Sequence, residues 1–289
     1  MELIWKTFTE WFRELLVNGI ISNLDGLFDA VNARVSEIAG QVGATPQTWN
    51  GGIFNMIRAL SDNLVLPVAG VVLTFVMTLE LLSIIAEKNN LADVDTWMFF
   101  KWIFKTACAV LIVSNTWNII MGVFEAAGSL VGGAARIVNA GTALTLEEHI
   151  AGLEAGLWDL EIPALLGLWL ESFLIGITMW VLSICIFVIT YGRMIEIYLT
   201  TSLAPIPMAA ALSRESGGMG QNYLRSLAAL GFQGFLILVC VAIYAVLIQN
   251  LVIGSSLSAA MWSALGYTVL LCFSLFKTGS LAKAIFGAR

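Results

Sequence analysis

Charged residues are scarce in this chain of 289 residues: Asp, Glu, Lys and Arg make up 12% of it, and hydrophobic residues make up 59%. Soluble domains average about 25% charged and about 45–50% apolar residues. So few charges leave too little polar surface to keep a folded chain of this size dissolved in water. The composition therefore excludes an ordinary soluble domain and predicts an integral membrane protein of the all-α class, whose long apolar runs suit transmembrane helices.

The sequence also lacks the motifs of a catalytic or cofactor site. Its single histidine, His149, lies beside Glu147 and Glu148 with no second ligand in view, and its four cysteines lie inside apolar runs without a CxxC pair. A metal site and a disulfide framework are both disfavoured by this pattern. No phosphate-binding glycine motif occurs. We therefore expect no enzyme and no cofactor, and any nucleotide-driven step would belong to another protein.

The first 63 residues are predicted to form an N-terminal amphipathic helical region. Apolar residues recur at steps of three and four between residues 2 and 39, and the charged residues lie elsewhere on the helix. Charges at this density are too costly for a lipid-facing span, so the segment is expected in the membrane interface, against a partner, or in a separate soluble bundle. Residues 40–52 form a turn-rich break.

Residues 64–289 are predicted to form a transmembrane domain with about five spans. A span needs about 20 apolar residues to cross roughly 30 Å of hydrocarbon, and the first predicted run has 22. The predicted spans lie near residues 64–85, 102–124, 164–190, 227–253 and 259–276. Residues 125–162 then form an outer amphipathic loop that is rich in acidic residues.

The distribution of Lys and Arg predicts the orientation in the cytoplasmic membrane. Basic residues accumulate in cytoplasmic loops. With the N-terminus outside and the C-terminus inside, nine basic residues face the cytoplasm, against Arg136 alone in the two outer loops. The nine are Lys88, Lys101, Lys105, Arg193, Arg214, Arg225, Lys277, Lys283 and Arg289. The opposite orientation is disfavoured because it would expose all nine.

The stretch LAPIPMAAALSRESGG, residues 203–218, interrupts the apolar pattern between the third and fourth spans. Pro205 and Pro207 lack backbone donors and disfavour helix just before them, and Gly217 and Gly218 follow in a polar bend. The run is too short and too broken to cross a bilayer. We call residues 203–220 the elbow; two geometries fit it equally, a re-entrant hairpin that lines a central opening and a surface hairpin of two interfacial helices.

Three polar residues within the predicted spans are candidates for function. Glu80 and Glu171 would be costly if ionised in lipid. Glu80 lies near the inner end of the first span, where its carboxylate could extend to the headgroups. For Glu171, a functional role facing a pore or another helix and the absence of any functional role fit the sequence equally well. Gln233 is expected to form hydrogen bonds between helices.

From Leu203 to Leu247 the chain resembles the TrbL-like polytopic membrane subunits of type IV secretion and conjugation systems, in the version found on Gram-positive mobile genetic elements. The matching features are the proline-containing turn, the glycine-bearing bend, Asn222-Tyr223 with Arg225, and ALGFQG opening a span. The resemblance implies a channel subunit of the cell membrane that helps pass single-stranded DNA with its bound relaxase. It also implies partner ATPases and a homo-oligomeric ring around a common axis.

The short acidic loop at residues 125–162 departs from the larger outer loop of these relatives, and acidic side chains repel phosphate. Arg193, Arg214 and Arg225 are the better candidates for phosphate contact on the cytoplasmic side. A small-solute transporter is the alternative function, with Glu171 in a midplane site, although no internal repeat of the kind common in transporters is visible. A membrane anchor that holds a secretion complex without lining its path is a third possibility.

Overall fold

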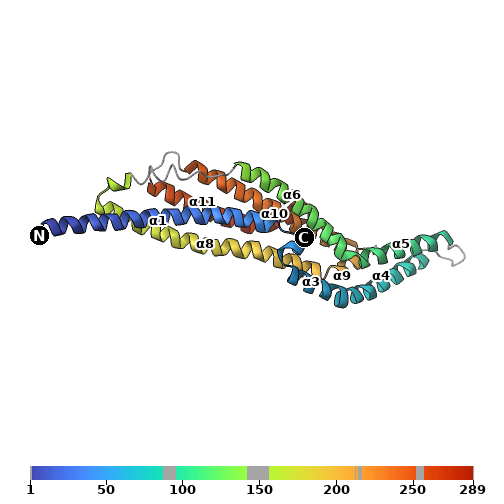
Figure 1. The fold of residues 1–289 in the computed structure, drawn as a ribbon. Coiled ribbons are helices and arrows are strands. Elements are labelled where there is room, and N and C mark those ends of the chain that lie inside the picture. Colours follow the sequence, from blue (N-terminus) through green and yellow to red (C-terminus); the bar gives the residue numbers. More distant parts are fainter. Residues whose placement is uncertain are drawn as a thin grey trace. The chain divides into compact units, whose positions relative to one another are not determined.

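The computed structural model describes residues 2–86, 96–141, 156–211, 213, 217–251 and 257–288. Every regular element in these residues is a helix (Figure 1), which confirms the predicted all-α class. Six of the described helices are long and apolar enough to cross a membrane: Gly51–Ala86, Thr96–Ser114, Thr116–Ile137, Ile162–Ser202, Gly217–Ile248 and Leu257–Phe286. The chain is a multi-pass membrane protein.

The sixth such helix, beyond the five or so predicted, arises from a bend at Asn115. This residue separates α5 (Thr96–Ser114) from α6 (Thr116–Gly141). The backbone hydrogen bonds continue through the bend, because the Asn115 N–H donates to Leu111 O at 3.1 Å and the Ile119 N–H donates to Asn115 O at 3.0 Å. The Asn115 side chain also donates to Leu111 O, at 2.9 Å. Such local competition from an asparagine side chain bends a helix without ending it.

The chain divides into two compact units, each assembled from separated stretches. The first unit comprises Met1–Val42, Gly132–Thr190 and Leu236–Lys277. The second comprises Gly43–Val131, Tyr191–Phe235 and Thr278–Arg289. The helices α6, α8 (Ile162–Ser202), α10 (Gly217–Leu251) and α11 (Leu257–Phe286) therefore contribute residues to both units.

Polar contacts between helices hold the first unit together. Its longest element is α1 (Glu2–Gly43), and Asn23 of α1 donates to Ser172 Oγ of α8 at 2.9 Å. Ser258 of α11 donates to the Glu171 carboxylate of α8 at 2.7 Å, and the hydroxyls of Tyr244 and Thr268 lie 2.8 Å apart between α10 and α11. Hydrogen bonds of this kind stabilise helix pairs in membranes by roughly 0.6–2 kcal/mol each.

The second unit begins with short capped helices. Thr45 caps α2 (Pro46–Trp49) in a capping box with Thr48, and Asn50 caps α3 (Gly51–Leu60) by accepting from the Ile53 N–H at 3.0 Å. A π-helical turn, η1 (Ser61–Val65), then leads into α4 (Leu66–Ala86) without a break. The turn-rich segment of the sequence is therefore a set of helix starts that redirects the chain after α1.

An aromatic cluster fixes α2 and α3 within the second unit. The Tyr198 hydroxyl of α8 donates to Pro46 O at 2.6 Å. The Trp49 ring lies 5.9 Å from the Tyr198 ring, and the Phe54 ring lies 5.3 Å from the Trp117 ring. Aromatic pairs at these separations add about 0.5–1.5 kcal/mol each beyond the area that they bury. This cluster orients the chain as it enters α4.

Candidate functional site

The elbow contains a short helix, α9 (Pro205–Ala210), with Pro205 in its first turn. Met208, Ala209 and Ala210 are buried, and Ala209 belongs to a hydrophobic cluster with Leu73 of α4 and Ala109 of α5. Figure 1 shows α4, α5 and α9 together in this part of the fold. The elbow thus packs against the hairpin of α4 and α5. Neither the re-entrant nor the interfacial geometry considered from the sequence included this packing.

The glycines of the elbow are not equivalent. An ideal Cβ at Gly220 would lie 2.0 Å from the Ala211 Cβ and 2.8 Å from Pro207 O, whereas one at Gly218 would meet nothing within 4 Å. A Cβ at Gly217 would lie 3.3 Å from Ala211 O. Gly220 is therefore the position where α10 approaches the end of α9 most closely. Gly217 and Gly218 were the predicted positions instead, because close approach of two helices leaves no mark in the sequence beyond a glycine.

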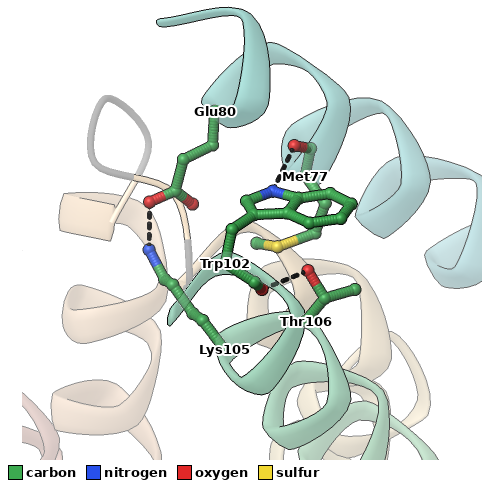
Figure 2. A network of polar contacts seen from close by, with 5 residues as sticks. All are labelled: Met77, Glu80, Trp102, Lys105 and Thr106. Atoms are coloured by element: carbon green, nitrogen blue, oxygen red, sulfur yellow. Dashed lines mark hydrogen bonds and ion pairs between the residues drawn. The ribbon is translucent and has the colours of Figure 1, made fainter. Parts of the chain in front are cut away.

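A polar network joins α4 to α5 near the connection of their hairpin (Figure 2). The Lys105 ammonium donates to Glu80 Oε1 at 2.5 Å, and the Trp102 indole N–H donates to Met77 O at 3.0 Å. Thr106 donates to Trp102 O at 2.9 Å and so fixes the turn that carries the indole. The Glu80 side chain is only 7% exposed, against 37% for Lys105.

This network gives Glu80 a protein partner, whereas the sequence analysis considered headgroup contact for it. The sequence does hold a signal for the pairing, because the two residues flank the predicted polar connection between adjacent spans. Oppositely charged residues on either side of such a connection reach similar depths in the membrane and can pair.

Arg193 occupies a position that the sequence analysis did not foresee. It is 7% exposed, and its guanidinium Nε and Nη2 donate to Leu230 O and Gly231 O of α10, both at 3.3 Å. In this structure the guanidinium joins α8 to α10 through these two hydrogen bonds and does not lie exposed for contact with a phosphate. Arginine suits this position because its planar fork can reach two carbonyls at once.

The ALGFQG motif, residues 229–234, is a point of helix contact. A Cβ at Gly231 would lie 3.3 Å from the Ala127 Cβ of α6, so the glycine allows α6 and α10 to approach. Gln233 donates to Thr278 Oγ1 of α11 at 3.3 Å, and its amide nitrogen lies 3.3 Å from the Cβ position of Gly279. The Phe232 ring lies 5.2 Å from that of Phe286. The motif thus binds the last turns of α11 to α10.

The other predicted residues lie in separate places. Arg225 is exposed on α10, and its Nη1 lies 3.8 Å from the Cβ position of Gly287, which has φ +62°. Glu171 belongs to the first unit and accepts the hydrogen bond from Ser258. Arg214 and His149 lie outside the described residues. Within the described part of the chain, no group of three His, Cys, Asp or Glu residues could hold a metal ion.

These observations define the class of the protein: a polytopic, all-α membrane protein in which several polar side chains join one helix to another. A family model described as TrbL/VirB6 plasmid conjugal transfer like protein matches residues 31–205, more than half of the chain. The chain belongs to this family, which confirms the resemblance drawn from the sequence. Searches of curated proteins and of solved structures found no match.

The family match and the resemblance cover different parts of the chain. The matched residues run from the middle of α1 to Pro205, whereas the features that carry the resemblance lie between residues 203 and 247. The general layout of the spans and the outer loop also contributed to the resemblance, so the two comparisons overlap in part and indicate the same family. Membership implies a subunit of a conjugal transfer machine, a type IV secretion system that works with further components.

Proposed function

We propose that the chain is a channel or scaffold subunit that helps move single-stranded DNA, with its bound relaxase, across the cytoplasmic membrane. The observation that carries this proposal is the family match over residues 31–205, which includes α4, α5 and nearly all of α8. No nucleotide-binding motif occurs in the sequence, so the energy would come from partner ATPases. Several copies would surround a common axis.

For the orientation, we propose that the N-terminus lies outside and the C-terminus in the cytoplasm. The continuous backbone bonding at Asn115 supports a single bent crossing by α5 and α6, which keeps the number of crossings odd. The excess of Lys and Arg in the loops then assigned to the cytoplasm supports the direction. A reporter enzyme that works only in the cytoplasm, fused after Arg289, should be active; inactivity there would reverse the orientation.

Contact with the transported strand is proposed at Arg214, within the elbow, and at Arg225, just after it. Arg225 is exposed in the second unit, and each phosphate contact by an arginine releases counterions from the nucleic acid. Arg193 is left out of this proposal because its guanidinium is buried against α10.

Photo-cross-linking during mating tests the proposed contact. A photoreactive amino acid replaces Arg225 in one strain and Leu199, an apolar residue that is 62% exposed, in a control strain. We expect plasmid DNA to be recovered with the chain from the Arg225 strain only, and only while the ATPases are active. Undiminished transfer with no DNA recovered from the Arg225 strain would contradict a DNA path at this residue and favour a scaffold.

A further inference from the structure

The first turns of α5 have two faces with different partners. On the inner face, the Trp102 indole donates to Met77 O of α4 and the Lys105 ammonium donates to Glu80 (Figure 2). A helix completes a turn in about 3.6 residues, so Trp97, Lys101 and Phe104 lie together on the opposite, outer face. Both helices belong to the second unit, and the two faces therefore follow from the hairpin alone.

The outer face is aromatic and carries one cation. Trp97 is 61% exposed and Phe104 is 72% exposed. Lys101, between them, is also exposed, and its Nζ lies 5.7 Å from the centroid of the Trp97 ring. This cation–π contact leaves the three N–H donors of the ammonium available for an anion. In the described part of the chain, Lys101 forms no ion pair with a carboxylate.

The charge pattern of the hairpin gives the depth of Lys101 in the membrane. No Asp, Glu, Lys or Arg occurs in residues 63–79 or in residues 106–124. At about 1.5 Å per residue, each run covers most of the roughly 30 Å of hydrocarbon. Glu80 and Lys105 directly adjoin these runs, so their pair marks the edge of the hydrocarbon. Lys101 lies about 6 Å beyond Lys105 along the helix axis, within the headgroup layer of about 5–8 Å.

The exposed side chains on the hydrocarbon side of this level suit acyl chains. Phe75 and Leu79 of α4 are exposed, and so are Ile103 and Leu111 of α5. Lipid therefore surrounds the hairpin up to the level of Lys101. Tryptophan rings and lysines at the end of such an apolar surface are typical of the headgroup region. The group that Lys101 meets there is a lipid headgroup.

We propose that Lys101, held by the Trp97 ring, binds the phosphate of an anionic phospholipid. In the orientation proposed above, this lipid belongs to the cytoplasmic leaflet, where anionic headgroups attract basic side chains. Phe104 contacts the acyl chains of the same lipid. Lys105 does not contribute, because its ammonium is paired with Glu80. The inference concerns the attachment of the hairpin to the membrane and does not require a role in DNA transfer.

Lipid binding to the purified full chain tests the proposal. The chain in detergent is titrated with phosphatidylglycerol, which is anionic, and separately with phosphatidylcholine, which is zwitterionic. Native mass spectrometry then gives the fraction of the chain with bound lipid. The variants are Lys101→Gln, which removes the charge, and Lys101→Arg, which keeps it. Lys6→Gln is the matched control, because it removes an exposed lysine from α1.

We expect Lys101→Gln to weaken binding of phosphatidylglycerol about fivefold, the contribution of one lysine near an anionic surface. Lys101→Arg and Lys6→Gln should bind it as the wild type does, and phosphatidylcholine should bind more weakly to every variant. All three variants change an exposed side chain, so each is expected to fold.

Three results would overturn the proposal. An equal loss of binding in Lys101→Gln and Lys6→Gln would mean a general effect of net charge. Equal affinity of the wild type for the two lipids would mean that the contact is apolar only. Displacement of phosphatidylglycerol by inorganic phosphate or by a single-stranded oligonucleotide at a similar concentration would assign Lys101 to a soluble phosphate or to DNA. None of these measurements depends on DNA transfer, so failure here leaves the proposed function standing.

Discussion

Replacing Gly220 with alanine will destabilise the second unit by about 3 kcal/mol, and replacing Gly218 with alanine will not. A Cβ at residue 220 would lie 2.0 Å from the Ala211 Cβ and 2.4 Å from the Ala211 Cα, so relief requires the backbone of α9 or α10 to move. Forcing extra atoms into a packed site typically costs 1–3 kcal/mol and occasionally more, so about 3 kcal/mol is expected for a clash with backbone. At residue 218 nothing lies within 4 Å, and alanine is favoured over glycine within a helix by about 1 kcal/mol.

The two substitutions are matched, since both add one methyl group to the first turns of α10. Thermal unfolding of the purified protein in detergent or nanodiscs measures the difference. The unfolding midpoint of Gly220→Ala should fall, and that of Gly218→Ala should stay level or rise. Equal midpoints for the two variants would show that the elbow does not pack against α10 as described.

Replacing Lys105 with methionine is expected to destabilise the hairpin of α4 and α5 by about 3–5 kcal/mol. Glu80 is 7% exposed, and its carboxylate would lose the ammonium that lies 2.5 Å away. Removing the partner of a buried carboxylate carries a cost of this size because the charge is left in apolar surroundings, or must take up a proton to become neutral.

Two control variants separate this effect from the loss of any lysine. Lys101 is exposed and lies over the Trp97 ring at 5.7 Å, so Lys101→Met should cost under about 1 kcal/mol. The double variant Glu80→Leu with Lys105→Met should recover most of the stability, since replacing both partners of a buried pair is often neutral. A double variant no more stable than Lys105→Met would mean that the pair is not what holds the hairpin.

Much of the fold follows from the local pattern of the sequence. Long apolar runs predict membrane helices wherever they occur. Pro205 and the glycines that follow it predict the break in helix at the elbow. The bend at Asn115 was harder to predict, because an asparagine within an apolar run signals a hydrogen bond without saying whether it joins two helices or bends one.

The partners of polar residues could not be predicted from the local pattern. Arg193 was expected on the cytoplasmic side because Lys and Arg accumulate in cytoplasmic loops, but tertiary packing places its guanidinium against two carbonyls of α10. Gly220 and Gly218 look alike in the sequence, and only the positions of Ala211 and Pro207 O in the fold distinguish them.

The placement of α1 beside α8 shows the same limit. The sequence pattern predicts an amphipathic helix, and its charges exclude a lipid-facing span. The predicted locations were therefore the membrane interface, the surface of a partner or a separate soluble bundle. Which neighbour an amphipathic helix selects depends on contacts far apart in the chain, such as Asn23 with Ser172. Charges exclude lipid contact for one face of a helix, not proximity to membrane spans for the whole of it.

The central claim, that this chain is a subunit on which conjugal DNA transfer depends, is tested most directly by the transfer frequency of donor cells that lack it. The account predicts that transfer falls to background without the chain, returns with the wild-type chain and with Gly218→Ala, and does not return fully with Gly220→Ala. Transfer at the wild-type frequency from donors that lack the chain would contradict the claim.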